Sequence, residues 1–116
     1  TCLPNDITKL IEGISSLSMG NQTGLGISCN MVNGIVYAYW WVKDRCIKQM
    51  ESRVHALRNL TKGLKGHCVV ETCPEDLKSL IDVWGLEGPQ IDLMKRIKQQ
   101  FDPGDILNPG RFVEGI

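Results

Sequence analysis

The sequence lacks several features that would indicate a function directly. Its 13 basic and 13 acidic side chains cancel, so no net positive field would attract nucleic acid or an anionic membrane surface. No apolar run approaches the roughly 20 residues that a membrane-spanning helix needs. The longest uncharged apolar stretch, Gly34–Val42, has the length of a β-strand. These absences exclude a nucleic-acid-binding protein that relies on its charge, and a membrane span.

Cysteine and histidine are present, but not in the patterns that bind metals or build nucleophilic sites. The five cysteines contain no CxxC pair, and their odd number excludes a complete set of intrachain disulfides. Neither His55 nor His67 has a Ser, Asp or Glu in a recognisable catalytic relation, and no phosphate-binding glycine loop is present. We therefore expect reduced, mostly buried thiols, no metal ion, and a cytoplasmic protein.

What the sequence does contain is an ordinary globular composition. At 116 residues and 42% hydrophobic content, the chain has the size of one domain, 1–116, with a two-layer core. It begins at Thr1 with neither an initiator methionine nor a signal-like segment, so we expect one domain of a larger polypeptide.

Two helices are predicted in the first half of the chain. Apolar residues at helical spacing favour a helix over 7–17, with Asn5 as its N-cap and Met19-Gly20-Asn21 as its stop. A longer helix follows Asp44 and ends near Gly63. Its inward-facing stripe is predicted to be Ile47, Met50, Val54, Leu57 and Leu60.

Three strands are predicted. Residues 24–31 alternate apolar and polar side chains, and residues 35–42 are rich in β-branched and aromatic residues. Asn33-Gly34 between them favours a type I′ hairpin turn, in which both residues adopt positive φ. Residues 67–72 are the third predicted strand.

The last third of the chain is predicted to be helical with a structured tail. Thr72-Cys73-Pro74-Glu75 has the form of a capping box and opens a short helix through Ile81. A final helix, 91–101, stops at Asp102-Pro103-Gly104, because proline disfavours helical geometry at the residue before it. Asn108-Pro109-Gly110 makes a second turn. Three buried anchors are expected to hold the tail: Ile106, Leu107 and Phe112.

The order of these elements predicts an α+β fold. With one more strand ending at Thr1-Cys2-Leu3, the pattern becomes βαββαβ, a ferredoxin-like antiparallel sheet with two helices on one face. In this interpretation the first strand is truncated, and two C-terminal helices and the tail cover the remaining apolar surface. Trp40 and Trp41 point to opposite faces of the sheet, so we expect one in the core and the other toward a missing partner.

Residues 94–110, which begin Met94-Lys-Arg-Ile-Lys and end with the Asn108-Pro109-Gly110 turn, resemble the closing segment of FAD-linked oxidases of the vanillyl-alcohol oxidase type. Residues 33–37, Asn-Gly-Ile-Val-Tyr, and 82–85, Asp-Val-Trp-Gly, are similar to the FAD-binding E subunits of glycolate oxidases. The resemblance implies the C-terminal cap domain of an enzyme that oxidises a small 2-hydroxy acid. FAD would then be held mainly by a domain outside this chain, and the isolated chain would be inactive.

Two asparagines are the cofactor contacts that this resemblance implies. Asn108 stands in the Leu-Asn-Pro-Gly segment that lies near the flavin in the family, although its amide can equally close its own turn. Asn33 lies in the hairpin that carries metal-binding histidines in the related D-2-hydroxyacid dehydrogenases. Asn30 and Tyr37 occupy those histidine positions here, which predicts no metal. Asn33-Gly34 can equally be only a favourable turn.

The resemblance also implies partners. They are the FAD-binding domain of the parent protein and other oxidase subunits, including an iron–sulfur subunit, and through them the periphery of a membrane. The alternative is a free-standing ferredoxin-like binding or regulatory module, which would need a solvated outer sheet face and a complete first strand.

Overall fold

The computed structural model describes residues 1–17, 23–42, 46–86, 88–111 and 113–115. The elements in chain order are η1 (Pro4–Asp6), α1 (Ile7–Ser16), β1 (Thr23–Asn30), β2 (Ile35–Val42), α2 (Ile47–Gly63), α3 (Glu75–Lys78), α4 (Pro89–Phe101) and η2 (Val113–Gly115). The predicted α+β class is confirmed by this combination of an antiparallel sheet with several helices. Within the described ranges, no helix has both the length and the apolar character that crossing a membrane requires.

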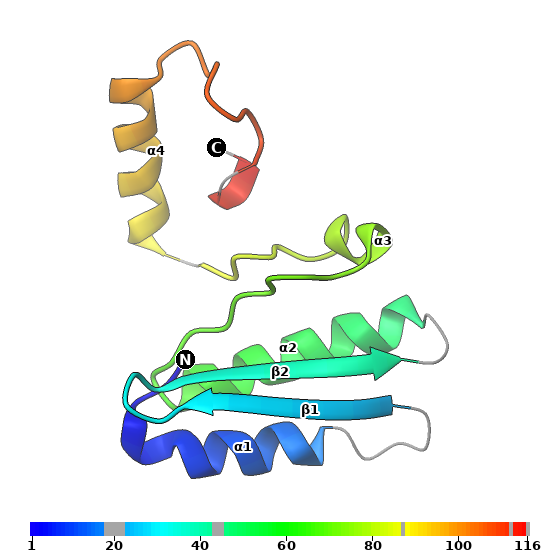
Figure 1. The fold of residues 1–116 in the computed structure, drawn as a ribbon. Coiled ribbons are helices and arrows are strands. Elements are labelled where there is room, and N and C mark those ends of the chain that lie inside the picture. Colours follow the sequence, from blue (N-terminus) through cyan, green and yellow to red (C-terminus); the bar gives the residue numbers. More distant parts are fainter. Residues whose placement is uncertain (18–22, 43–45, 87, 112, 116) are drawn as a thin grey trace.

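The first part of the chain forms a layer of sheet with helices α1 and α2 packed on it (Figure 1). β1 and β2 pair in an antiparallel register that places Asn30 opposite Ile35. The core is a buried cluster of Cys2, Ile7, Leu10 and Ile14. Alternate residues of the two strands pack against it, namely Leu25, Ile27, Val36, Ala38 and Trp40. The predicted apolar face of the first helix is therefore the face that builds the core.

The opposite face of β2 carries a row of aromatic side chains. Tyr37 stacks with Tyr39 at a ring-centroid distance of 6.4 Å, and Tyr39 stacks with Trp41 at 6.5 Å. Trp41 is 64% exposed, whereas Trp40 packs against the core. The prediction of one inward and one exposed tryptophan is confirmed. The outer face is thus aromatic at these positions, not the solvated polar face that a free-standing module would need.

The hairpin turn differs from the predicted two-residue type I′ turn. Four residues connect Asn30 to β2, and of these only Gly34 has a positive φ, of 64°. The Asn30 side-chain oxygen accepts hydrogen bonds from the backbone N–H groups of Val32 and Asn33 (3.2 and 3.3 Å), which favours the longer turn. Glycine is required at position 34, because a Cβ there would lie 2.0 Å from the carbonyl oxygen of Cys2.

The predicted third strand at 67–72 is wrong as an element of the sheet, which has two strands in the part of the chain that the structure describes. Figure 1 shows this segment as an extended connection. Its backbone hydrogen bonds are isolated: His67 pairs with Thr1, and the Val70 N–H donates to the Val83 carbonyl (2.8 Å). A strand needs a continuous ladder, and the neighbouring first strand consists here only of Thr1 and Cys2.

The first two helices begin differently from the prediction. Asn5 lies inside η1, and α1 begins at Ile7 after Asp6, so Asn5 is not its N-cap. The predicted stop at 19–21 and the predicted cap at Asp44 lie outside the described residues. α2 ends at Gly63 as predicted, and its inward stripe is half-buried.

The predicted capping box is also wrong. α3 begins at Glu75 with Pro74 as its N-cap and without a side-chain cap hydrogen bond, so Thr72 does not cap it. It ends at Lys78 and not at Ile81.

The cysteines are free, as expected, but the expectation that they are mostly buried is wrong. Cys2 is buried, Cys29 and Cys46 are exposed, and the other two are half-buried. Cys29 lies one residue before the end of β1 and Cys46 directly before α2, so both stand at the margin of the packed layer.

Candidate functional site

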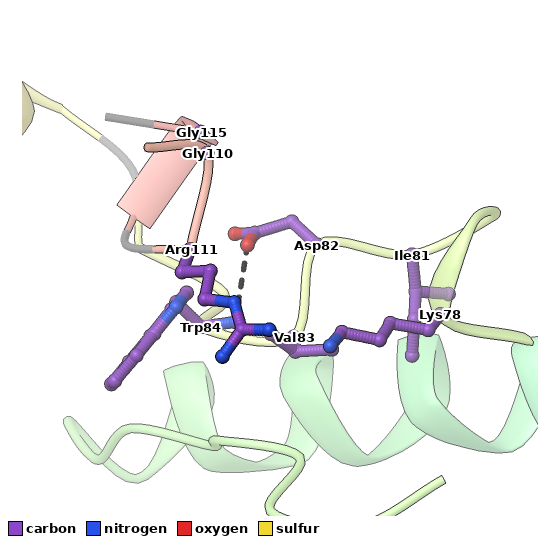
Figure 2. Close-up of a pocket in the computed structure, with 8 residues that line it drawn as sticks. All are labelled: Lys78, Ile81, Asp82, Val83, Trp84, Gly110, Arg111 and Gly115. Carbon is purple, nitrogen blue, oxygen red and sulfur yellow. Dashed lines mark hydrogen bonds between the residues drawn. The ribbon is translucent and has the colours of Figure 1, made fainter. Parts of the chain in front are cut away.

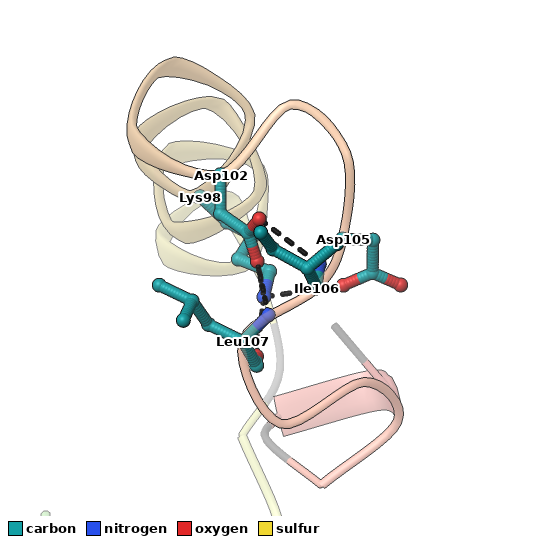
Figure 3. Close-up of polar contacts among 5 residues, drawn as sticks. All are labelled: Lys98, Asp102, Asp105, Ile106 and Leu107. Carbon is teal, nitrogen blue, oxygen red and sulfur yellow. Dashed lines mark hydrogen bonds and ion pairs between the residues drawn. The ribbon is translucent and has the colours of Figure 1, made fainter.

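The C-terminal tail is organised around the carboxylate of Asp102, at the end of α4 (Figure 3). This carboxylate accepts hydrogen bonds from the backbone N–H groups of Ile106 (3.0 Å) and Leu107 (2.9 Å). Lys98, one helical turn earlier, contacts the same carboxylate at 2.5 Å and also donates to the Leu107 carbonyl (2.8 Å). Asp105 accepts a third contact from Lys98 at 3.1 Å. The tail therefore folds back onto the last turn of α4 through a buried acid and a lysine.

These contacts also shift the protonation of Asp102. The hydrogen bond from Lys98, followed by those from the Ile106 and Leu107 amides, lowers the pKa of Asp102 from 3.8 to about 2. The same hydrogen bond raises the pKa of Lys98. Both side chains are consequently charged at neutral pH, and the loop is held by charge-assisted hydrogen bonds.

Asn108 follows directly and is exposed, with a left-handed φ of 50°. Its turn is closed by the backbone, since the Arg111 N–H donates to the Asn108 carbonyl at 3.2 Å. No hydrogen bond joins the Asn108 side chain to any residue in the described ranges. The Asn108 turn is thus closed by backbone groups, and the contact of its side-chain amide with a flavin stays a prediction.

The apolar anchors that the sequence predicts in the tail are not buried. Ile106 is 80% and Leu107 63% exposed, and Phe112 lies outside the described residues. Among the described residues of the tail, Val113 is the apolar one that is buried. The loop is held by the polar contacts of Asp102, so its apolar side chains can point outward.

α4 shows the same outward-facing apolar character. Leu93, Ile97 and Phe101 follow one another at four-residue spacing, which places them on one helical face, and all three are exposed. The helical spacing of Ile91, Met94, Ile97 and Phe101 predicts that this face of the final helix is buried. That prediction is confirmed for Ile91 and is wrong for Ile97 and Phe101. Figure 1 shows α4 and the tail set apart from the layer of β1, β2 and α2. We call Leu93, Ile97, Phe101, Ile106 and Leu107 the C-terminal apolar surface.

A turn at 82–85 fastens the connection before α4 to the helical layer. The Asp82 carboxylate accepts hydrogen bonds from the N–H groups of Trp84 (3.0 Å) and Gly85 (2.7 Å), and Arg58 of α2 donates to the Asp82 carbonyl. Gly85 has a φ of 62°, and a Cβ there would lie 2.7 Å from Nε of Arg58. The Asp-Val-Trp-Gly sequence is thus a compact turn held against α2.

A cavity of about 510 Å³ lies between this turn and the tail (Figure 2). It is lined by Lys78, Ile81, Asp82, Val83, Trp84, Gly110, Arg111 and Gly115. Figure 2 shows Arg111 reaching from the tail toward the turn. The cavity therefore brings two cationic side chains, Lys78 and Arg111, close to the Asn108 turn. Nothing local in the sequence links residue 78 to residue 111, so the sequence does not predict this arrangement.

The second candidate contact, Asn33, is not brought to this place. It lies in the hairpin turn at the end of the sheet, whereas Asn108 lies beyond α4 on the other side of the 64–88 connection (Figure 1). Asn33 is exposed, and its neighbour Asn30 uses its side-chain oxygen to stabilise the turn.

Residues 86–112 match the model of the family described as FAD linked oxidases, C-terminal domain. The matched segment is less than half of the chain and consists of α4, the Asp102 loop and the Asn108 turn. No curated protein and no solved structure matches the chain in the other two comparisons. The match links this part of the chain to the C-terminal domain of an FAD-linked oxidase.

The residues of the matched segment fit some parts of a flavin better than others. FAD carries two phosphates, which proteins usually bind with several backbone N–H groups or a helix N-terminus. The helix of this segment begins with Pro89, which has no backbone N–H. Asn108 and Arg111, by contrast, present an exposed amide and a cation. The segment fits a contact at the edge of a flavin, and does not fit its enclosure.

Proposed function

We propose that this chain is the C-terminal cap domain of an FAD-dependent oxidoreductase similar to the glycolate oxidase E subunits, and that the parent enzyme oxidises a small 2-hydroxy acid. The observation that carries the proposal is the match at 86–112, because the matched segment coincides with the tail that presents Asn108. FAD, held by another domain, supplies the two-electron chemistry when bound.

The proposal gives the C-terminal apolar surface a role. Exposed apolar patches on a folded protein commonly mark an interaction site. Leu93, Ile97 and Phe101 would pack against the FAD-binding domain, and the Asp102 loop would hold Ile106 and Leu107 in position for the same contact. Docking of this surface would bring the Asn108 amide to the flavin.

Further partners belong to the same proposal. Electrons from the reduced flavin would pass to other oxidase subunits, among them an iron–sulfur subunit, in a cytoplasmic assembly at the periphery of a membrane. We also propose that Asn33, in the hairpin turn between β1 and β2, makes a second contact with the cofactor region of the parent enzyme. The aromatic row of Tyr37, Tyr39 and Trp41 beside that hairpin offers a further face for a partner.

The test uses the parent protein and glycolate as a representative 2-hydroxy acid. We expect the purified parent to contain FAD and glycolate to bleach the flavin absorbance without oxygen. Asn108→Gly should slow that bleaching by about tenfold, the scale of one lost hydrogen bond. Glycine is the suitable replacement, because it removes the amide and adopts the φ of 50° without strain.

Gln100→Ala is the matched control, since it removes another exposed amide, two residues before Asp102. It should leave the bleaching rate unchanged. A parent without flavin, or a flavin that no small 2-hydroxy acid reduces, would exclude the proposed function. An equal effect of Asn108→Gly and Gln100→Ala would exclude only the role of Asn108.

A further inference from the structure

The cavity between the 82–85 turn and the tail combines charges of both signs with an apolar wall. Lys78 and Arg111 each contribute a positive charge and Asp82 a negative one, so its ionised side chains leave a single net positive charge. The larger apolar side chains of the lining are Ile81, Val83 and Trp84. A cavity of about 510 Å³ with an apolar wall and a few convergent polar groups has the make-up of a small-molecule site.

The two cations of this cavity are not neutralised by the chain itself. Lys78 ends α3 and Arg111 follows the Asn108 turn, and within the described ranges neither side chain takes part in an ion pair or a hydrogen bond. Figure 2 shows both side chains extending across the 82–85 turn toward each other. Because like charges that converge on one cavity repel each other, an anion placed between them would be stabilised by both.

The Asp82 carboxylate also lines the cavity, but its charge is directed to the turn. Its Oδ1 accepts the Trp84 N–H at 3.0 Å, and its Oδ2 accepts the Gly85 N–H at 2.7 Å. An ionised carboxylate has about four acceptor positions, so these two hydrogen bonds fix its orientation and leave each oxygen able to accept another. A ligand in the cavity can therefore donate a hydrogen bond to Asp82.

Both walls of the cavity are held in place without a ligand. Arg58 of α2 donates to the Asp82 carbonyl, which fixes the turn. On the opposite wall the Arg111 N–H donates to the Asn108 carbonyl at 3.2 Å, and Gly110 between them has a φ of 69°. A ligand would thus order side chains more than backbone, which lowers the entropic cost of binding.

We propose that this cavity is a binding site for an organic hydroxy acid with an apolar side chain. The carboxylate lies between Arg111 and Lys78, since a guanidinium can bind a carboxylate through two parallel hydrogen bonds and an ammonium adds a second charge. The hydroxyl group donates to Asp82. The apolar side chain of the acid lies against Val83 and Trp84.

The charges of the cavity favour this class of ligand over others. A monoanion neutralises the single net positive charge, whereas a dianion such as phosphate would leave a net negative charge beside Asp82. A cation would be repelled by Lys78 and Arg111. An acid without a donor group would cover the Asp82 carboxylate without pairing it, at a cost in desolvation. The inference rests on this cavity alone and not on the proposed function.

The experiment titrates the 116-residue chain at constant ionic strength with 3-phenyllactate and with 3-phenylpropionate, which carries the same charge and ring but no hydroxyl. The amide resonances of Trp84 and Gly85 are followed by NMR, because both amides bond the Asp82 carboxylate. We expect saturable shifts with both acids. The hydroxy acid should bind about fivefold or more tightly, the scale of one additional hydrogen bond.

Three substitutions locate the carboxylate. Arg111→Gln and Lys78→Gln should each weaken binding of 3-phenyllactate by about tenfold, because each removes one charged partner. Arg96→Gln is the matched control, since it removes an exposed arginine of α4 that does not line the cavity, and it should change the affinity less than about twofold. Unchanged resonances of the Ile106 and Leu107 amides show that the tail of each variant is folded.

Four results would overturn the proposal. They are no saturable shift up to about 20 mM acid, equal affinity for the two acids, equal losses from Arg111→Gln and Arg96→Gln, and tighter binding of inorganic phosphate than of 3-phenyllactate. The titration contains no flavin, so any of these results would leave the proposed function standing. A parent protein without flavin would exclude the proposed function and leave this site standing.

Discussion

At the scale of single residues, Asp102 determines how the tail is held and how it responds to pH. Its folded pKa of about 2 lies below the ordinary 3.8, so its ionised form stabilises the tail above pH 3.8, and this stabilisation is lost as the pH falls through about 2. We expect the amide resonances of Ile106 and Leu107 to titrate with a midpoint near 2, as followed by NMR.

Two substitutions check this assignment. Asp102→Asn should abolish the titration and release the Ile106 and Leu107 amides, whereas Asp105→Asn should leave the midpoint near 2, because Asp105 contacts Lys98 and not those amides. A midpoint near 3.8 in the unmodified chain would show that the Asp102 hydrogen bonds do not form in solution.

At the scale of elements, the hairpin depends on glycine at position 34. Gly34→Ala places a Cβ 2.0 Å from the Cys2 carbonyl at a φ of 64°, so it should destabilise the chain by roughly 2 kcal/mol or more. Gly63→Ala is the matched control, because a Cβ at the end of α2 meets nothing within 4 Å. It should stabilise by about 0.5–1 kcal/mol. Urea unfolding of both variants measures the difference, and equal midpoints would contradict the close approach of Cys2.

The elements also show which parts of this molecule are predictable from sequence. The helical stripe that contains Ile7, Leu10 and Ile14 and the opposite orientations of Trp40 and Trp41 were predicted correctly, because each pattern is local and its partner lies within this chain. The strand at 67–72 was not predicted correctly, because an extended segment becomes a strand only where a neighbouring strand forms hydrogen bonds with it. The same reason explains the exposed Phe101 and Ile106, whose helical and turn patterns are correct but whose packing partner is absent from the described residues.

The candidate site divides in a similar way. Asn108 was found through the Leu-Asn-Pro-Gly segment, and the match at 86–112 covers the same residues. The hydrogen bonds that the Asp102 carboxylate accepts from the Ile106 and Leu107 amides were not predicted, because a helix-stopping Asp-Pro-Gly sequence does not specify which N–H groups will donate to its carboxylate. The approach of Lys78 and Arg111 around one cavity depends on tertiary structure alone.

At the scale of the whole molecule, the distribution of phosphate-binding groups predicts how the isolated chain behaves toward flavin. We expect purified 116-residue protein to retain no FAD and to oxidise no 2-hydroxy acid, because the sequence contains no glycine-rich phosphate-binding loop. The helix of the matched segment is a poor substitute, since it begins with proline and carries the acidic Asp92 in its first turn. Absorbance spectroscopy and equilibrium dialysis with FAD measure this. Stoichiometric flavin in the purified chain would contradict the expectation.

The C-terminal apolar surface predicts how the chain behaves in solution. Ile97 and Phe101 are 49% and 84% exposed, so replacing both with glutamine removes apolar surface that stabilises little within the chain. Each substitution should change the free energy of unfolding by less than about 0.5 kcal/mol, while lowering self-association in sedimentation experiments.

Ile91→Gln on the same helix provides the contrast. Ile91 is buried, so a polar amide there should destabilise the chain by about 2–4 kcal/mol. In the parent enzyme the double variant Ile97→Gln with Phe101→Gln should no longer be neutral. It would remove the contact with the FAD-binding domain and so increase flavin loss. If the double variant unfolds the isolated chain as readily as Ile91→Gln does, the surface packs within the chain and is not available to a partner.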